Sequence, residues 1–493
     1  MTKLRDMTSG PINRGVVGES AEKIIKIWGR GKKKDSKHIC YLWVKMVGNR
    51  LSDKHVKYCK VTAETDYTSM MEFPDLIDDQ MYSYDAGYIN ILPDVDMEEL
   101  SEKIYAMEMD LPYKCCLPSE KRRWSFIFGS CRYQFELGPV RLFGTGESSD
   151  KIYETIYHHD PEFFLSIGDQ IYLDPIGSVL RNKNIDDIRK LYRNARKYDG
   201  IRMLYSSTPI YEMCDDHDIH RNDTDYFKQI ADINAYQNAV QAYMEYQHHC
   251  GPHSPLKLYY SFDRQNATFF VMDTRTGRTE DRIISNDQMA DVKKWLRDEK
   301  NMDKVKFLVS PVPFASQTEP DSFYGFPEQQ REIVETMFGY DDAGEAIKNV
   351  FILAGDAHCG RVAQYRVTNE HNEIVGELIE VISSGLAAIK HDRGKPYTNP
   401  NDCKLTVEYD SDNNFPFCVD NLGRKGLLFT TVYATNTHPN PHKANGIIDK
   451  LSVPFKMVTD NIFVQVSIDV NGVTFEIYNQ KNTPLETIHV KLF

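Results

Sequence analysis

The sequence has no long apolar run and few cysteines, and both absences narrow the possible classes of protein. No stretch of about 18 consecutive apolar residues occurs, so we expect no transmembrane helix. The chain has 10 cysteines among 493 residues, forms no C-x-x-C pair, and places them singly apart from Cys115 and Cys116. A disulfide scaffold needs a far higher density. We therefore expect a functional cysteine of this chain to be a metal ligand or a nucleophile rather than half of a disulfide.

Positive charge is also in short supply. Lys and Arg total 59 against 72 for Asp and Glu, which gives a net charge of −13. Proteins that bind nucleic acids or anionic membranes need a basic face, so we expect no nucleic-acid partner and no stable membrane insertion. A small phosphorylated substrate held by a metal ion is compatible with this balance. The first twenty residues lack the apolar region of a secretory signal, and we expect a cytoplasmic protein.

Two widespread catalytic motifs are missing as well. The sequence contains neither the Walker A lysine pattern nor a G-x-S-x-G nucleophile elbow. The overall composition, with 41% hydrophobic and 27% charged residues, is that of an ordinary soluble globular protein. A chain of this length is expected to form several domains, or one large α/β domain with additions.

The pattern of apolar and polar residues changes along the chain and predicts three regions. Residues 1–20 are polar with Gly and Pro, and we expect a mobile tail. Residues 21–119 carry short alternating apolar runs separated by turn-rich stretches, which predicts a small β-sandwich domain. Residues 120–493 alternate apolar runs with helical periodicity, which predicts a layered α/β domain. This last domain includes a C-terminal β-hairpin over 463–478, with an Asn-Gly turn.

The expected elements of the α/β domain follow from hydrophobic periodicity. Apolar spacing predicts one helix over about 223–246 and a second over 286–300. Buried strands are predicted at 124–128, 163–167, 209–213, 268–272, 306–309 and 350–353.

Chemically active residues follow four of these strands. Ligands of open α/β sheets bind beyond the carboxyl ends of the strands, so these residues are candidates for one site. A single Gly-Asp after a strand is more often a turn or a helix cap, and an acidic loop is often merely solvated. Three acids in four residues beside a buried strand, however, require a cation or basic partners. The four segments are Gly129-Ser130-Cys131, Gly168-Asp169-Gln170-Ile171-Tyr172, Asp215-Asp216-His217-Asp218 with Asn222-Asp223, and Gly355-Asp356-Ala357-His358.

The order of these motifs resembles that of a known family. Gly-Ser-Cys, Gly-Asp-Gln-Ile-Tyr, Asp-Asp-His-Asp with Asn-Asp, and Gly-Asp-x-His are similar to the PhoD-like metallophosphatases, also called alkaline phosphatase D. These belong among the calcineurin-like metallophosphoesterases. The similarity spans about residues 124–385, with weaker echoes at 271–275, 309–314 and 321–327. It implies a layered α/β/β/α sandwich, preceded by a small all-β domain of immunoglobulin or fibronectin type.

The resemblance also implies cofactors, namely Fe³⁺ with one or more divalent ions, Ca²⁺ first among them. Cys131 and Tyr172 match thiolate and phenolate ligands of the ferric ion, which favours anionic ligands, and Asp169 matches a carboxylate shared between metals. The amide of Asn222 and the hard carboxylate oxygens suit a divalent ion. The alternative for Cys131 is a buried core cysteine. The implied metal ligands are Cys131, Asp169, Tyr172, Asn222, Asp356 and His358.

The activity implied is metal-dependent hydrolysis of phosphomonoesters or phosphodiesters, with a metal-activated hydroxide attacking phosphorus in line with the leaving oxygen. Asp169 and His358 belong to this catalytic centre. His217 is our candidate for protonating the leaving group; the alternative is that it orients a neighbouring carboxylate.

Two arginines are candidates for binding the phosphate oxygens of a substrate. Arg221 and Arg275 offer planar guanidinium groups that bind such oxygens in pairs. Arg275 is equally compatible with a structural pairing to Asp273. His220 is expected on the surface of its loop rather than in contact with the substrate.

Two other functions stay open at this stage. One is a phospholipase-like phosphodiesterase that acts on lipid headgroups, and the other is a non-catalytic interaction protein that keeps the fold. The N-terminal β-domain is a candidate interaction module, within the chain or between chains. Specificity is expected in the long segments 174–201 and 394–454, the second of which is a lid or an insertion.

Overall fold

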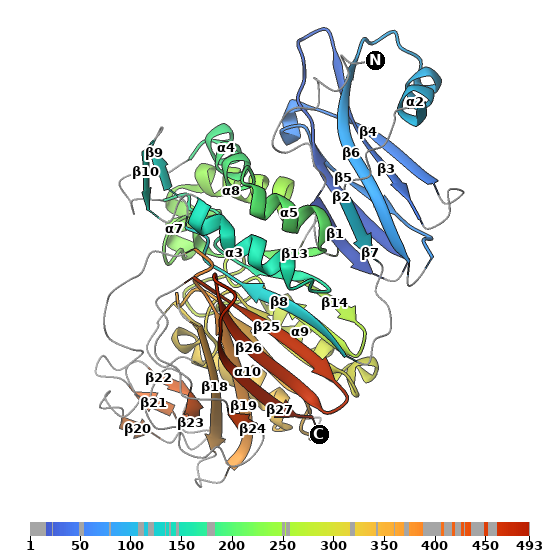
Figure 1. Cartoon of the computed structure of the whole chain (residues 1–493). Coiled ribbons are helices and arrows are strands. Elements are labelled where there is room, and N and C mark those ends of the chain that lie inside the picture. Colours follow the sequence, from blue (N-terminus) through green and yellow to red (C-terminus); the bar gives the residue numbers. More distant parts are fainter. Residues whose placement is uncertain are drawn as a thin grey trace.

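The computed structural model shows two groups of β-sheets and two layers of helices (Figure 1). A smaller region at the N-terminal end, drawn in blue, consists of β-strands and one α-helix. A larger α/β region contains the rest of the described chain. The structure describes residues 16–21, 23–48, 54–77, 80–106, 113–116, 123–133, 135–137, 140–143, 147–174, 183–248, 252, 257–315, 321–341, 344–358, 360–368, 374–387, 406–408, 417–419, 425–427, 429–434, 448–451 and 461–492.

Two antiparallel sheets make up the N-terminal region. Their strand orders are β1-β2-β5 and β4-β3-β6-β7. Alternate side chains of both sheets, such as Ile27, Leu42, Val44 and Tyr84, are buried in one core, so the sheets pack face to face. The strands are β1 (Val16–Ala21), β2 (Ile24–Arg30), β3 (Ile39–Val47), β4 (Lys54–Val61), β5 (Thr68–Phe73), β6 (Met81–Ile91) and β7 (Tyr113–Cys116), with the 3₁₀ turn η1 (Ala63–Thr65).

Two details differ from the sequence prediction in this region. Residues 16–20, predicted as part of a mobile tail, form strand β1, because Val16 and Val17 pair with Trp28 and Ile27 in an antiparallel ladder. Residues 1–15 of that tail lie outside the described residues. The predicted all-β segment also contains helix α2 (Met97–Ala106), whose buried Leu100 packs against the outer face of the second sheet.

Two seven-stranded sheets form the centre of the α/β region. Their orders are β13-β11-β8-β25-β26-β27-β24 and β14-β15-β16-β17-β19-β18-β23. Strands β8, β11 and β13 run parallel in the first sheet, and β15, β16, β17 and β19 run parallel in the second. The bounds are β8 (Arg123–Gly129), β11 (Phe164–Ile167), β13 (Ile210–Met213), β14 (Tyr260–Arg264), β15 (Ala267–Val271), β16 (Val305–Ser310), β17 (Val350–Ala354), β18 (Gly360–Thr368), β19 (Ile374–Ser383), β23 (Phe429–Ala434), β24 (Ile448–Leu451), β25 (Ile462–Asp469), β26 (Gly472–Asn479) and β27 (Pro484–Lys491).

Aromatic side chains fill the space between these two sheets. Phe126 and Phe163 from the first sheet meet Phe269 and Phe307 from the second, with ring centroids 4.9–5.4 Å apart. Helices cover both outer faces, so the region has the four layers that the family resemblance implies. The covering helices are α3 (Glu147–His158), α4 (Ile185–Ala195), α5 (Asp199–Ser207) and α8 (Ile233–Tyr246) on the first sheet, and α9 (Asn286–Arg297) and α10 (Pro327–Phe338) on the second.

The C-terminal hairpin is present and lies within the first sheet, between β8 and β27. Strands β25 and β26 pair around Asn471 and Gly472, and β25 pairs antiparallel with β8 (Figure 1, red beside cyan). The helix predicted over 223–246 is instead divided at Asp232, whose backbone is not helical. The remaining short elements are α6 (Asp216–Ile219), α7 (Tyr226–Ala231), η3 (Glu299–Asn301), η4 (Phe323–Gly325), β9 (Phe135–Leu137), β10 (Val140–Phe143), β20 (Thr406–Glu408), β21 (Phe417–Val419) and β22 (Lys425–Leu427).

Buried polar contacts fasten the N-terminal sheets to the helices of the first layer. The indole Nε1 of Trp28 donates to the Glu245 carbonyl at 2.9 Å, and the Tyr84 hydroxyl donates to the Ser206 carbonyl at 2.7 Å. Trp28 is itself buried in the core beneath these helices. The role of the N-terminal β-domain as an interaction module, within the chain or between chains, stays a prediction.

Two further sequence predictions concern the segment 394–454 and membrane-spanning helices. Most of the segment 394–454 lies outside the described residues, so its role as a lid or an insertion stays a prediction. In the part of the chain that is described, no helix has both the length and the apolar character needed to span a bilayer.

Candidate metal centre

The two seven-stranded sheets are joined at one point, beside the carboxyl ends of their parallel strands. Ser130, just after β8, pairs with Ser384, just after β19, in an isolated parallel bridge. The Ser130 amide donates to the Ser383 carbonyl at 3.0 Å, and the Ser383 hydroxyl donates to the Phe128 carbonyl at 2.9 Å. Because the ends of parallel strands carry the loops of an α/β site, this junction brings loops from both sheets together.

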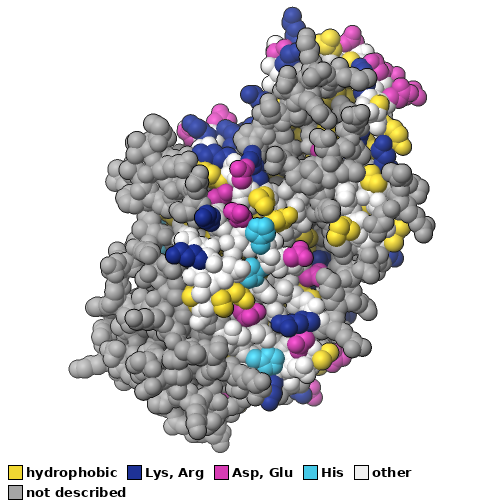
Figure 2. Space-filling view, in the orientation of Figure 1, with side chains coloured by type: hydrophobic (Ala, Val, Ile, Leu, Met, Phe, Trp, Pro, Cys, Tyr) yellow, Lys and Arg dark blue, Asp and Glu magenta, His cyan; other side chains and the backbone are white. Residues whose placement is uncertain are grey.

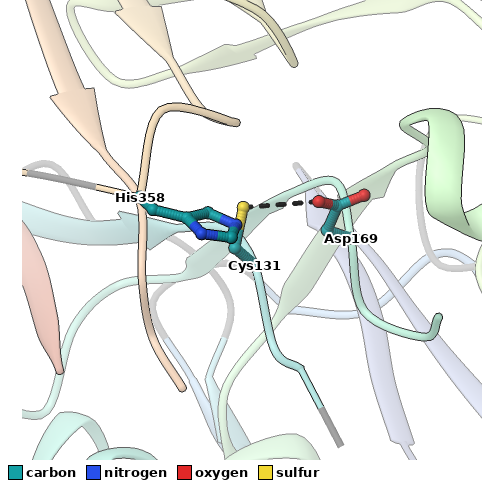
Figure 3. A group of neighbouring side chains, drawn as sticks. All are labelled: Cys131, Asp169 and His358. Carbon is teal, nitrogen blue, oxygen red and sulfur yellow. Dashed lines mark hydrogen bonds between the residues drawn. The ribbon is translucent and has the colours of Figure 1, made fainter. Parts of the chain in front are cut away.

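Three side chains from three strand ends meet at this junction (Figure 3). The Sγ of Cys131 lies 3.4 Å from Oδ2 of Asp169. Ligand atoms of Cys131, Asp169 and His358 all lie within 4.8 Å of one another. Figure 3 shows the His358 ring on one side of the sulfur and the Asp169 carboxylate on the other. The structure therefore brings together residues 227 positions apart in the sequence, as predicted.

Tyr172 and Asp356 complete this group. The Tyr172 hydroxyl donates to Oδ2 of Asp169 at 3.1 Å, on the same oxygen that faces Cys131. A carboxylate oxygen of Asp356 lies within 4.8 Å of carboxylate oxygens of Asp169 and Asp215. Five of the six predicted ligands thus form one cluster.

The backbone at this cluster is in a sparsely populated conformation. The φ angles are 61° at Cys131, 56° at Asp169, 60° at Asp356 and 49° at His358. Left-handed conformations cost non-glycine residues free energy and are found mainly at functional sites. Four such residues in one cluster mean that the surrounding fold holds their side chains in place against this cost.

A buried carboxylate holds two of the site loops together. Asp218 accepts hydrogen bonds from the backbone amides of Asp169, Gln170 and Ile171 at 2.7–3.1 Å, and from the Asp215 amide at 3.0 Å. With both oxygens saturated by amides, Asp218 is a structural acid rather than a ligand. It fixes the loop after β11 against the loop after β13.

Burial of so many acids shifts their pKa values. Burial raises the pKa of Asp169 and of Asp356 well above the usual range, and raises that of Asp215 to about 7 even though Arg275 opposes the shift. Burial also raises the pKa of the Cys131 thiol, and Asp169 and Asp356 add to it. Without a cation, these groups resist carrying their charges together.

His217 is held between an acid and an aromatic ring. Its Nδ1 lies 2.5 Å from Oδ1 of Asp174, and its ring stacks on Tyr172 with centroids 4.2 Å apart. Burial lowers the pKa of His217, but Asp216, Asp169 and Asp174 outweigh this and hold the pKa well above its usual value. These acids therefore favour the cationic form of the ring.

Asn222, the sixth predicted ligand, shares a partner with His217, namely Asp174. Its backbone N–H donates to Oδ2 of Asp174 at 3.0 Å, and the residue is exposed. Its role as a metal ligand stays a prediction.

The predicted substrate-binding arginines have different surroundings. The guanidinium of Arg275 is fully buried and bonds Asp215 at 2.5 Å and Asp321 at 2.7 Å, while only its amide bonds Asp273. These bonds engage Nε and Nη1 of the guanidinium, while Nη2 has no hydrogen bond to the described residues and lies 3.9 Å from Oδ2 of Asp216. The role of Arg275 in binding phosphate stays a prediction. Arg221 is half-buried, and its role stays a prediction. His220, expected on the surface, is instead fully buried.

The comparison with protein families decides the identity of the chain. The model of the PhoD-like phosphatases matches residues 143–423, more than half of the sequence. The chain belongs to the PhoD-like phosphatases. It is accordingly a hydrolase of phosphoric ester bonds. Asp169, Tyr172, Asp356 and His358 lie within the matched range.

Solved structures agree with this PhoD-like phosphatase in fold. The structure of PhoD superposes with a TM-score of 0.61 at 12% identity, covering 98% of this chain and 91% of that one. A purple acid phosphatase, PPD1, from yellow lupin (Lupinus luteus) seeds gives a TM-score of 0.57 at 11% identity, covering 98% and 75%. No curated protein sequence matched. At such identities the likeness shows the fold alone.

Several residues of this PhoD-like phosphatase escaped the sequence prediction. Asp216 lies with Asp169 and His217 in a group of potential ligands, and its own position in the acidic motif was the available signal. Ser384 donates to the Cys131 sulfur at 3.1 Å and accepts from the His358 amide at 2.8 Å. Nothing in the local sequence after β19 marks that serine, because its place depends on the junction of the two sheets.

The residues fit a metal centre. Oδ1 of Asp169 and Oδ2 of Asp215 are buried, and neither has a hydrogen-bond partner among the described residues. An unpaired buried carboxylate oxygen is costly unless a cation meets it. Thiol, phenol, carboxylate and imidazole together are also the donor types that transition metals and hard divalent ions use.

Proposed function

We propose that this chain is a metal-dependent phosphomonoesterase or phosphodiesterase with a ferric ion and a divalent ion, Ca²⁺ first among the candidates. The observation that carries the proposal is the group of Cys131, Asp169 and His358, whose ligand atoms lie within 4.8 Å of one another at the junction of the sheets. Cys131 and Tyr172 would hold the ferric ion as anions, and Asp169 would be shared between the metals. The remaining metal ligands would be Asn222, Asp356 and His358. When bound, such metals polarise phosphate oxygens and acidify water.

The protein side chains supply proton transfer and position. His217 would donate a proton to the leaving oxygen from its second ring nitrogen, since its Nδ1 is held by Asp174. The stack on Tyr172 fixes the plane of the ring. Arg275, bonded to Asp215 and Asp321, would hold these acids in place and offset part of their charge.

The substrate proposed is a small phosphorylated molecule. Among the described atoms of the face in Figure 2, basic and acidic side chains are interspersed. Together with the net charge of −13, this favours a small substrate over nucleic acid. A phosphodiesterase acting on lipid headgroups is the second candidate. A non-catalytic role is not favoured, because each predicted ligand position carries a residue able to bind metal. We also propose a cytoplasmic location.

Turnover of a monoester and a diester tests the proposal. The purified protein would be assayed with p-nitrophenyl phosphate and bis(p-nitrophenyl) phosphate, before and after treatment with a chelator. We expect turnover of at least one ester, its loss in the chelator, and its recovery when metal is returned. Asp186→Asn, at a side chain 88% exposed, is the matched control for Asp169→Asn, which we expect to be inactive. Turnover that persists in the chelator, or none with either ester, would contradict the proposal.

A further inference from the structure

The hydroxyl group of Ser384 contacts two of the predicted metal ligands at once. Its oxygen accepts from the backbone N–H of His358 at 2.8 Å, and its hydroxyl donates to Sγ of Cys131 at 3.1 Å. Cys131 comes just after β8 of the first sheet, and His358 comes after β17 of the second. Ser384 itself is 1% exposed, so bulk water does not compete for these bonds. One buried side chain therefore connects ligand loops from both sheets.

The chemistry of a hydroxyl group decides which way its hydrogen points. A serine hydroxyl has one hydrogen to donate and two lone pairs that accept. The N–H of His358 can only donate, so it uses a lone pair of the Ser384 oxygen and leaves the hydroxyl hydrogen for the sulfur of Cys131. The Ser130 hydroxyl also lies 3.4 Å from this sulfur, but it is equally 3.4 Å from the Ser383 carbonyl, to which it donates. Ser384 is therefore the better donor to the sulfur.

The backbone places Ser384 independently of its side chain. Ser384 and Ser130 form the bridge that joins the two sheets. The N–H groups of Gly385 and Leu386, the next two residues, both donate to the Ser130 carbonyl, at 3.2 and 3.0 Å. These bonds stay in place when the hydroxyl is removed. A substitution of Ser384 by alanine should therefore fold and should take away only the two hydroxyl contacts.

We propose that Ser384 is a positioning residue for the ferric ion, whose hydroxyl stabilises the thiolate of Cys131 and holds the His358 loop beside it. This inference rests on the proposed function and deepens it, because it assigns a residue that supports two of the proposed ligands. Partners of this kind orient metal ligands and tune the metal. A hydrogen bond to a thiolate withdraws electron density from the sulfur, which then donates less charge to iron and makes the reduction potential more positive.

Removal of the hydroxyl tests the proposal through the iron itself. In Ser384→Ala we expect the affinity for iron, measured by competition with a chelator, to fall about 10–100-fold, the range for residues that support metal ligands. The thiolate-to-iron absorption band should move to longer wavelength, and the reduction potential should become more negative, because the sulfur donates more charge. Ser130→Ala should change all three quantities less, since the Ser130 hydrogen is shared with the Ser383 carbonyl.

The matched control is Ser166→Ala. Ser166 is a fully buried serine of β11, and its hydroxyl has no hydrogen-bond partner among the described residues. We expect this variant to equal the native protein in iron affinity, absorption band and reduction potential. Native values in Ser384→Ala, or equal changes in Ser166→Ala, would overturn the role of Ser384 and leave the proposed function intact. A native protein without iron would instead overturn the ferric site of the proposed function.

A measurement on the protein with Ser384 in place covers the case in which Ser384→Ala does not fold. The iron–sulfur stretching frequency, observed by resonance Raman spectroscopy, should shift after exchange into D₂O, because deuterium replaces the hydrogen directed at the sulfur. The shift should persist in Ser130→Ala. Its absence from the native protein, or its loss in Ser130→Ala, would overturn the assignment of Ser384 as the donor.

Discussion

At the scale of single residues, the centre depends on side chains that position other side chains. The carboxylate of Asp174 bonds both the His217 ring and the backbone N–H of Asn222. It is therefore a positioning residue for the proposed acid. Asn in its place keeps the size but weakens the bond to a cationic ring.

We predict that Asp174→Asn lowers kcat about 10–100-fold for esters of alkyl alcohols, the range typical of lost supporting hydrogen bonds. For p-nitrophenyl esters the loss should be much smaller, because p-nitrophenolate leaves without being protonated. Asp199→Asn, at a side chain 82% exposed, is the control. Equal losses with both kinds of ester would show that Asp174 has only a structural role.

The predicted ligands Cys131, Asp169 and His358 came from residue type, strand ends and family resemblance, and the structure brings them together. The environment of Arg275 could not be predicted, because both acids that bind its guanidinium approach from other loops. His220 was misplaced for a similar reason. Whether a loop histidine is buried depends on its packing against segments that are distant in the sequence.

At the scale of elements, the turn after β11 places Asp169, and a glycine makes this turn possible. Gly168 has φ of +91°, and a Cβ there would stand 2.6 Å from the Cβ of Asp215. The loops after β11 and β13 therefore touch at a point that accepts no side chain. Gly344 is the matched control position, because it has the same left-handed backbone but an open environment. Its φ is +72°, and a Cβ added there would have no atom within 4 Å.

We predict that Gly344→Ala lowers the free energy of unfolding by about 1 kcal/mol, the cost of a left-handed backbone alone. Gly168→Ala should cost roughly 2–5 kcal/mol, because the loops must also separate. It should lower the bound metal as well. Urea denaturation and metal analysis measure the two effects. Equal costs at the two glycines would refute the close approach of the loops.

Elements with strong periodicity were predicted well. Helix α9 and the C-terminal hairpin lie where hydrophobic spacing and the Asn-Gly turn placed them. Helix α2 was missed because its apolar side chains are few and it interrupts a run of strands. The break at Asp232 between α7 and α8 was missed because apolar residues continue across it.

At the scale of the whole molecule, the buried acids tie stability to metal and pH. The pKa of Asp215 is raised to about 7 by burial, and those of Asp169 and Asp356 are raised well above the usual range. Such groups bind more protons in the folded than in the unfolded protein. Their stabilising contribution is therefore present at low pH and is lost as the pH rises from about 4, the unfolded value, through 7 and beyond.

We predict that chelator-treated protein loses thermal stability between pH 5 and pH 8, and that metal-loaded protein loses much less. A bound cation favours the charged carboxylates and so removes the penalty. The gap in Tm between the two preparations should therefore widen with pH. A gap that is constant or narrows over this range would contradict the electrostatic account.

The most direct test of the central claim is the metal content of the purified protein, measured together with its visible absorption. The account predicts iron in the native protein and a thiolate- or phenolate-to-iron absorption band. It predicts that Cys131→Ser loses iron and alters the band. Cys40→Ser, at a buried free cysteine of the N-terminal sheets, should keep both. Unchanged iron content and absorption in Cys131→Ser would contradict the account.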